Sequence, residues 1–207
     1  SYELMQMAGH SIYEYIKQYK NILVVTGVGN NAGDGFVIAS QARIEGKNVV
    51  VWNLASIDKL PIDAKKAADE YILSGGLMYD EAINQNFDCI VDAIFGVGLN
   101  KDITGKFAQA IHWINQQNSI ILAVDIPSGL EADTGNILSC AIKADMTVTV
   151  LCYKIGLITN NGKDLCGRLF CEDLNIPDQT FQPLESTIHL LEKVDMDLKK
   201  LSRLHNS

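Results

Sequence analysis

The stretch from Thr26 to Gly35, with the sequence TGVGNNAGDG, constrains the fold of this chain more than any other. It follows the apolar run 22–25 and precedes the apolar run 36–39, so it predicts a buried strand, a glycine-rich turn and the start of a helix. Glycines leave room for a phosphate to approach the main chain, and a helix N-terminus offers it free N–H groups. The stretch therefore predicts a phosphate-binding turn in an α/β protein.

The turn differs from the standard dinucleotide-binding fingerprint in two ways. Three residues separate Gly29 from Gly33, whereas the fingerprint has two at this point. The second strand is expected over 48–54, and Asn53 stands near its end, where an NAD-binding strand carries an acidic residue for the ribose. Both differences disfavour an ordinary NAD-dependent oxidoreductase.

Polar residues occupy the tip of the turn, although glycines alone would give it its shape. They are Asn30, Asn31 and Asp34. These side chains either contact a ligand, or the asparagines tolerate left-handed backbone angles while Asp34 caps the helix. Local sequence leaves both interpretations open.

Composition limits the class of protein. A chain of 207 residues with 47% hydrophobic residues is long enough for one domain with a sizeable core. Its formal net charge of −8 disfavours a nucleic-acid partner, which requires a basic surface. The sequence has no apolar run long enough for a membrane span and no signal-peptide pattern. We therefore expect a cytoplasmic protein that binds neither nucleic acid nor membranes.

Cysteine and histidine usage points away from disulfides and zinc. The five cysteines are odd in number and form no C-x-x-C pair, which favours free thiols in a reducing compartment. The four histidines are scattered without metal-ligand spacing, so a zinc site is not expected.

Apolar periodicity and glycine stops predict alternating strands and helices. Helices are expected over 3–19, from the glycine-rich turn to Glu45, over 63–74 and over 106–116, with a helical turn at 80–86. Strands are expected over 21–26, 48–54, 77–79, 89–96, 119–124, 145–152 and 168–173. This order predicts a doubly wound α/β sheet covered by helices on both faces.

Polar side chains recur where the predicted strands end, the edge at which ligands gather in such sheets. They include Asp92, Asp125, Ser128 and Lys154, beside the asparagines of the first turn. Each aspartate follows an apolar strand, so we expect one side of its carboxylate to be buried and the other to face a crevice. The alternatives are structural: Asp92 caps its loop, Asp125 and Ser128 shape a turn, and Lys154 is a solvated lysine at a strand end.

Three of these strand ends supply oxygen ligands. Asn31, Asp92 and Ser128 carry an amide, a carboxylate and a hydroxyl, which suit a hard monovalent or divalent cation.

Four motifs resemble, in order and spacing, those of the NAD(P)H-hydrate epimerase family, also called the YjeF N-terminal domain. They are GVGNNAGDG, VDAIFGVGL, AVDIPSGLEADTG and the strand that ends in Tyr153-Lys154-Ile155-Gly156. The resemblance extends from Leu4 to about Pro177. It implies an α/β fold, a Rossmann-like three-layer α/β/α sandwich with a mainly parallel sheet. It also implies interconversion of the R and S epimers of hydrated NADH and NADPH, and a bound potassium ion.

The resemblance also implies roles for individual residues. Potassium would be bound by Asn31, Asp92 and Ser128. The substrate would be contacted by Asn30, Asn31, Ala32, Gly33, Asp34, Gly96, Val97, Gly98, Leu99, Asn100, Lys101, Asp102 and Asp125.

This sequence departs from the family pattern at three positions. Val28 replaces a more usual Pro, Ala32 replaces a Gly, and Tyr153 replaces the Pro that commonly precedes the strand-end lysine. The first two leave the turn intact, and the third bears on the setting of Lys154.

The implied reaction takes place at C6 of the hydrated nicotinamide ring. Loss of hydroxide from C6 leaves a cation that the ring nitrogen stabilises, and water can then add to the opposite face. We expect Asp125 to act in acid–base catalysis or to stabilise the cation, with Lys154 as a positioning residue or a second acid–base partner.

Two other classes of function remain open at this point. One is a non-catalytic binding scaffold, since the domain also resembles parts of some RNA-decapping and lipoprotein-associated proteins. A scaffold has no reason to retain Asn31, Asp92 and Asp125 together, and the net charge of −8 disfavours RNA. The other is an ordinary enzyme that acts on a nucleotide or sugar phosphate.

The end of the chain differs from the rest. We expect residues 1–177 to form the epimerase-like domain and 178–207 to be a C-terminal segment with an amphipathic helix over 189–204. The helix would either dock on its own domain or belong to a linker. In many members of the family an ADP/ATP-dependent dehydratase domain follows, and we expect this chain to be a domain of such a fused protein. We also considered that the chain forms a homodimer.

Overall fold

Seven parallel strands form one sheet in the computed structural model, which describes residues 1–176. Their order across the sheet is β3-β2-β1-β4-β5-β6-β7. In chain order the strands are β1 (Asn21–Thr26), β2 (Asn48–Asn53), β3 (Leu77–Tyr79), β4 (Cys89–Ala93), β5 (Ile120–Val124), β6 (Met146–Val150) and β7 (Arg168–Glu172). The order reverses between β1 and β4, so the carboxyl ends of these two strands border the crevice in which such sheets bind ligands.

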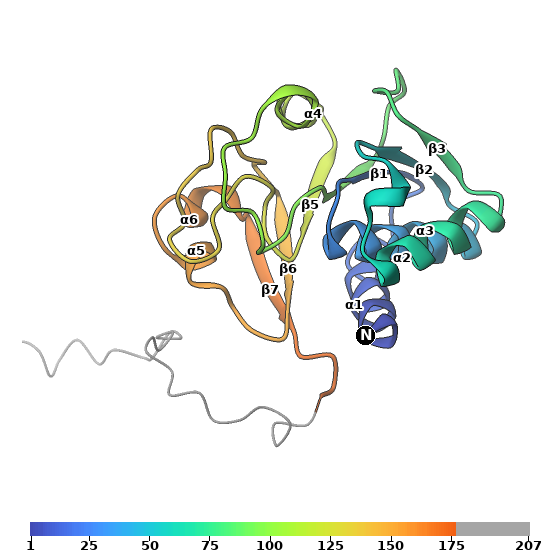
Figure 1. Cartoon of the computed structure of the whole chain (residues 1–207), viewed down its shortest axis with the longest axis horizontal. Helices are drawn as coiled ribbons and strands as arrows, with labels where there is room; N and C mark the ends of the chain where they lie inside the picture. The colour runs from blue at the N-terminus through green and yellow to red at the C-terminus, as the bar shows by residue number, and fades with distance from the viewer. Residues whose placement is uncertain (177–207) are drawn as a thin grey trace, which may run out of the picture. The chain divides into compact units, whose positions relative to one another are not determined.

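Helices cover both faces of the sheet, and the predicted three-layer α/β fold is confirmed. Figure 1 shows three helices gathered beside β1 and β2, and α4 beyond the opposite face. The helices are α1 (Tyr2–Tyr13), α2 (Asn30–Ile44), α3 (Ile62–Leu73), α4 (Gly105–Asn115), the single turns α5 (Ile155–Ile158) and α6 (Gly162–Leu165), and the 3₁₀ turn η1 (Ile57–Lys59).

The central strand β1 shows how the sequence builds this core. Ile22 and Val24 pack into the cluster that contains α1, α2 and α3, whereas Leu23 and Val25 pack into the cluster that contains α4. Successive side chains of a strand point to opposite faces, and both faces of a parallel sheet are buried. A continuous apolar run is therefore what this position requires.

Helix α2 begins earlier than the sequence predicted. Asn30, Asn31 and Asp34 belong to its first two turns rather than to a loop, and the N-cap position is occupied by Gly29, which supplies no side-chain cap. The proposed capping role of Asp34 is therefore wrong. Two of the glycines serve helix packing instead: a Cβ at Gly33 would lie 2.4 Å from Met5 Sδ, and one at Gly35 would lie 2.7 Å from Ala93 Cβ.

Two smaller predictions were also wrong. Helix α1 ends at Tyr13 and continues only as turns, although apolar spacing had extended it to residue 19. Residues 80–86 contain no helix, because this short polar stretch has few buried contacts to hold one. No helix of residues 1–176 is long and apolar enough to cross a membrane.

All of the named strands and helices lie within Ser1–Leu174. The amphipathic helix predicted over 189–204, and most of the segment 178–207 assigned to it, lie outside the described residues.

Candidate functional site

A cavity of about 510 Å³ opens at the carboxyl ends of β1, β4 and β5. This is the edge at which the sequence placed its polar residues. The cavity is lined by Val28, Gly29, Asn30, Asn31, Asp34, Pro61, Ile94, Phe95, Gly96, Val97, Gly98, Leu99, Asn100, Lys101, Asp125 and Val150.

One wall of this cavity is the N-terminus of α2. Asn30, Asn31 and Asp34 all line it. The first N–H groups of a helix have no partner within the helix, and Gly29 provides no side chain to cap them. The wall is therefore suited to an anionic group such as a phosphate.

The segment that follows β4 forms another wall of the cavity. Gly96 to Lys101 all line the cavity, and Leu99 N–H donates to the carbonyl of Gly96 over 3.3 Å. Lys101 is the only cationic side chain among the lining residues of this cavity. Its charge and the N-terminus of α2 both give the cavity positive character.

The end of β1 approaches this segment closely. A Cβ at Gly27 would lie 2.0 Å from the carbonyl oxygen of Ile94, so only glycine fits here. Gly27 N–H donates to the carbonyl of Ala93 over 3.3 Å. The contact joins the two strands at the point where their order reverses.

Asp125 follows β5 and turns its carboxylate into the cavity. Its φ of 66° lies in the left-handed region, which aspartate adopts more readily than most residues. Its N–H donates to the carbonyl of Val148 over 2.8 Å, so the turn is attached to β6. Oδ1 accepts hydrogen bonds from Thr149 Oγ1 over 2.9 Å and from the N–H of Val150 over 3.3 Å.

Lys154 forms an ion pair with Asp125 and is not a solvated lysine. Its Nζ donates to Asp125 Oδ1, to Thr149 Oγ1 over 2.7 Å and to the carbonyl of Val150 over 2.9 Å. The Lys154 side chain is 16% exposed and that of Asp125 is 14% exposed. Within residues 1–176, Oδ2 of Asp125 accepts no hydrogen bond, so one oxygen is held while the other can meet a ligand.

Ser128 and Asn31 both contact the backbone of Phe95, and Asp92 is joined to this group through Ser128. Ser128 donates its hydroxyl to Asp92 Oδ1 over 2.6 Å and its N–H to Oδ2 over 2.8 Å. Phe95 N–H donates to Ser128 Oγ over 2.9 Å. Asn31 Nδ2 donates to the carbonyl of Phe95 over 3.0 Å, which leaves Asn31 Oδ1 available as a ligand.

Asp92 itself differs from the prediction, because it does not face the crevice. It lies inside β4, paired in register with Val25 and Ala123, and is completely buried. Burial raises the pKa of Asp92 to about 6, although the two hydrogen bonds from Ser128 and one from Ile94 N–H act in the opposite direction. In residues 1–176 it has no cationic partner, so its charge is balanced only by neutral donors.

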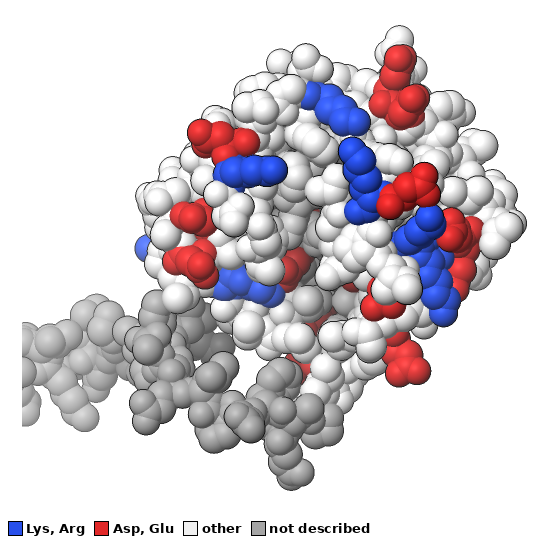
Figure 2. All heavy atoms as spheres, viewed as in Figure 1, with Lys and Arg blue, Asp and Glu red and all other residues white. Residues whose placement is uncertain are grey.

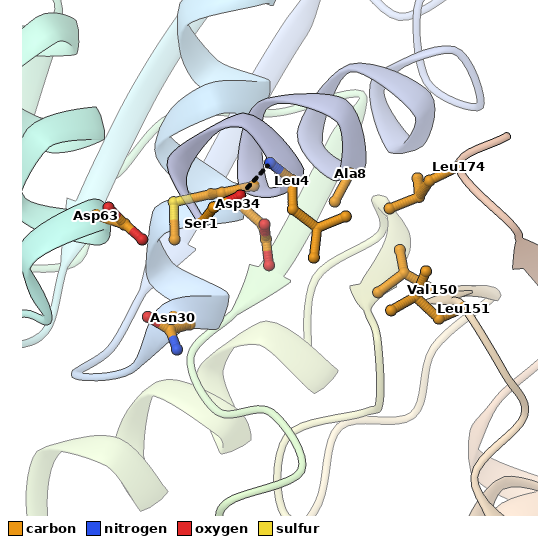
Figure 3. Close-up of a pocket in the computed structure, with 10 residues that line it drawn as sticks. Ser1, Leu4, Ala8, Asn30, Asp34, Asp63, Val150, Leu151 and Leu174 are labelled. Atoms are coloured by element: carbon orange, nitrogen blue, oxygen red, sulfur yellow. Dashed lines mark hydrogen bonds between the residues drawn. The ribbon is translucent and has the colours of Figure 1, made fainter. Parts of the chain in front are cut away.

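A smaller cavity of about 180 Å³ adjoins the first and is drawn in Figure 3. Asn30, Asp34 and Val150 line both cavities. In Figure 3 the carboxylate of Asp34 points away from α2, toward the side of the cavity formed by Leu4 and Val150. Desolvation by this environment, together with the negative charge of Asp125, raises the pKa of Asp34 to about 8.

Most of the predicted substrate contacts line the larger cavity, and three do not. Ala32 and Gly33 are buried in the first turn of α2. Asp102 comes directly after the segment that lines the cavity. Sequence reasoning missed Thr149, Val150 and the carbonyl of Phe95. The alternation of Val and Thr in β6 was visible, but nothing local indicated that Thr149 would face Asp125.

On the face drawn in Figure 2, lysines and arginines lie interspersed with aspartates and glutamates and form no continuous basic patch over the described residues.

Residues 1–156 match the family model described as YjeF-related protein N-terminus. A protein of Oenococcus oeni named NAD(P)H-hydrate epimerase is 35% identical over 183 residues, which cover 84% of this chain and 85% of that protein. A protein of Leishmania major named bifunctional NAD(P)H-hydrate repair enzyme is 35% identical over 205 residues, covering 94% of this chain and 36% of that longer protein.

The fold likeness is independent of these names. The crystal structure of a yeast protein matches with a TM-score of 0.72 at 24% identity, and the match covers 89% of this chain and 87% of that one. At this identity the likeness concerns the fold alone.

Proposed function

This chain belongs to the family of the YjeF-related protein N-terminus, and we propose that it is an NAD(P)H-hydrate epimerase, which interconverts the R and S forms of hydrated NADH and NADPH. The observation that carries the proposal is the Asp125–Lys154 pair. It is held by β6, and Asp125 opens into a cavity whose two walls suit a phosphorylated ligand.

The chemistry requires the C6 hydroxyl of the hydrated ring to leave and water to return on either face. When the C–O bond breaks, its electron pair leaves with the oxygen and the ring nitrogen stabilises the positive charge at C6. A carboxylate beside the ring stabilises this charge and can accept the proton of the returning water. Asp125 fits both tasks, because Oδ1 is held by three donors and Oδ2 is free among the described residues.

Lys154 positions Asp125. Its three donor contacts fix the ammonium between β6 and the carboxylate, so the carboxylate cannot rotate freely. A fixed carboxylate loses little orientational freedom when the substrate binds, which lowers the barrier.

The rest of the dinucleotide supplies binding energy at a distance from C6. The N-terminus of α2 and Lys101 suit the pyrophosphate, and the apolar side chains Val28, Val97 and Leu99 suit a sugar or base. Contacts to these remote groups would position the ring over Asp125.

We also propose that Asn31, Asp92 and Ser128 hold a potassium ion, with the carbonyl of Phe95 beside them. Their amide, carboxylate and hydroxyl oxygens suit a hard cation. The fit is supported by Asp92, a completely buried carboxylate without a cationic partner in the described residues. When bound, the ion would supply positive charge that balances Asp92 and would fix the segment after β4.

One experiment tests the proposed function directly. Acid-hydrated NADH, with its R and S epimers first separated by chromatography, is incubated with the protein, and the ratio of epimers is followed over time. We expect either pure epimer to relax to the same mixture much faster than without protein. Binding of the hydrated nucleotide without any change in the ratio would overturn the proposal and favour a non-catalytic binding module.

We propose the cellular compartment of the protein from its cysteines. All five lie in the described residues as free thiols, so we infer a reducing compartment such as the cytoplasm. The likeness to both a single-activity and a bifunctional relative is compatible with a separate epimerase and with one fused to a dehydratase domain.

A further inference from the structure

Asp34 differs from Asp92 and Asp125 in having no partner among the described residues. It forms no side-chain hydrogen bond and no ion pair with any residue of 1–176, whereas Asp125 is held by three donors and Asp92 by three. A partly buried carboxyl group that has no partner loses some of its hydration without compensation. Retaining one at the edge of a cavity points to use by a ligand.

The packing of α2 directs this side chain toward the reaction site. Gly33 contacts Met5 and Ala64, and Gly35 contacts Ala93 and Thr26, so the residues on either side of Asp34 are fixed against the core. Asp34 is left on the remaining side of the helix. Figure 3 shows its carboxylate in the opening between α1 and the end of β6.

Asp34 and Asp125 share the larger cavity. Val150 lines both cavities beside Asp34, and the N–H of Val150 donates to Asp125 over 3.3 Å. Asp34 and Asp125 both line the larger cavity, and Asp125 is close enough for its charge to act on Asp34. Two carboxyl groups from different elements, α2 and the end of β5, therefore face one space.

We propose that Asp34 is a second acid–base residue, which gives a proton to the hydroxyl leaving C6 on one face of the ring, while Asp125 takes a proton from the water that attacks the other face. This inference rests on the proposed epimerase function. It explains how the site can invert the configuration at C6, because each face of the ring then has its own carboxyl group.

The C6–O bond breaks as the carboxyl proton of Asp34 passes to the departing oxygen, so water leaves and Asp34 becomes a carboxylate. A second water forms the new C6–O bond on the opposite face and gives one proton to the Asp125 carboxylate. The reverse reaction returns both protons, and exchange with solvent through the open cavity resets the pair between turnovers in one direction.

The surroundings keep Asp34 ready to donate. Leu4, Ala8, Val150, Leu151 and Leu174 line the smaller cavity around it. The charged groups that face it are Asp63 in the smaller cavity, Asp125 and Lys101 in the larger one, and Lys154, which is held on Asp125. Burial and the charge of Asp125 raise the pKa of Asp34 to about 8, so the group retains its proton at neutral pH.

The test compares Asp34→Asn with Asp133→Asn, which removes an exposed carboxyl group that lines neither cavity. We expect kcat of Asp34→Asn to fall by about 100-fold or more with KM changed only a few-fold, because proton transfer is lost while shape is retained. Asp133→Asn should keep wild-type kcat. The wild-type kcat should also decline above a pH of about 8, and this decline should vanish in Asp34→Asn.

A second variant separates catalysis from structure. Asp34→Ala leaves space for a small carboxylic acid next to the cavity, and added formate should restore part of its activity, more strongly at lower pH. A role in packing would show no such rescue. Running the wild-type reaction in water enriched in heavy oxygen should place one heavy oxygen at C6 per inversion.

The outcomes separate the two proposals. If the wild-type protein fails to interconvert the epimers, the proposed function is wrong. If the wild type is active but Asp34→Asn keeps near-native kcat and its pH profile, or if formate fails to rescue Asp34→Ala, Asp34 is not an acid–base residue and the epimerase proposal stands.

Discussion

Ser128 donates both its hydroxyl and its backbone N–H to the carboxylate of Asp92, over 2.6 and 2.8 Å. This contact joins the turn after β5 to the interior of β4. Ser128 Oγ also accepts a hydrogen bond from the N–H of Phe95. The proposed cation site is therefore part of the same framework that places Asp125. A change at Asp92 should affect both stability and the cation response.

The first prediction concerns this cation. Potassium should raise the melting temperature more than lithium at equal ionic strength, because amide, hydroxyl and carbonyl ligands suit a large, weakly hydrated ion. Asp92→Ala should remove the difference, whereas the exposed Asp133→Ala should retain it. Thermal unfolding in the two chloride salts measures this. Identical wild-type melting curves in both salts would count strongly against the site.

A second prediction concerns the Asp125–Lys154 pair. Asp125→Asn should reduce the rate of epimerisation by about 100-fold or more, since the change is nearly isosteric and removes only the ionisable group. Binding of the nucleotide should be little changed. Lys154→Ala should cost less, because water can replace part of a positioning contact, and the exposed Lys143→Ala serves as its control. Near-native turnover by Asp125→Asn would remove Asp125 from the mechanism.

The third prediction links Asp34 to stability. Its folded-state pKa of about 8 lies above the ordinary value of 3.8, so the native state binds a proton that the unfolded chain releases. Its contribution to the free energy of unfolding therefore declines as pH rises from about 4 to about 8. Asp34→Asn lacks this decline.

Urea denaturation of both proteins at about pH 5 and about pH 9 measures the effect. We expect Asp34→Asn to gain about 2 kcal/mol or more over wild type between the two conditions. A constant difference between the two proteins would show that Asp34 is ionised throughout this range.

A fourth prediction uses two glycines of one turn. Gly27→Ala should lower the free energy of unfolding by about 3 kcal/mol, since its Cβ would meet the Ile94 carbonyl oxygen at 2.0 Å. Gly29→Ala should cost less than about 1 kcal/mol, because no atom lies within 4 Å and its φ of −110° suits alanine. Equal destabilisation by the two substitutions would show that the close approach relaxes without cost.

Much of the fold could be predicted from local patterns. The strand at 21–26 has the predicted bounds, because a strand buried on both faces needs a continuous apolar run. The parallel order followed from alternating strands and helices. The polar cluster followed as well, since carboxyl ends of parallel strands meet at one edge, and this brought Asn31, Asp125 and Lys154 to the same region.

Contacts between residues far apart in the chain decided how deeply each carboxyl group is buried and how strongly it binds a proton. Asp92 and Asp125 both follow apolar residues, yet the register of β4 with β1 and β5 buries Asp92 while the turn after β5 exposes Asp125 to the cavity. Asp34 has no hydrogen-bond or ion-pair partner among the described residues, because the side chains that α1 and the end of β6 bring to it are apolar. Burial and proton affinity depend on neighbours far away in the chain, and a local pattern contains no information about which neighbours those are.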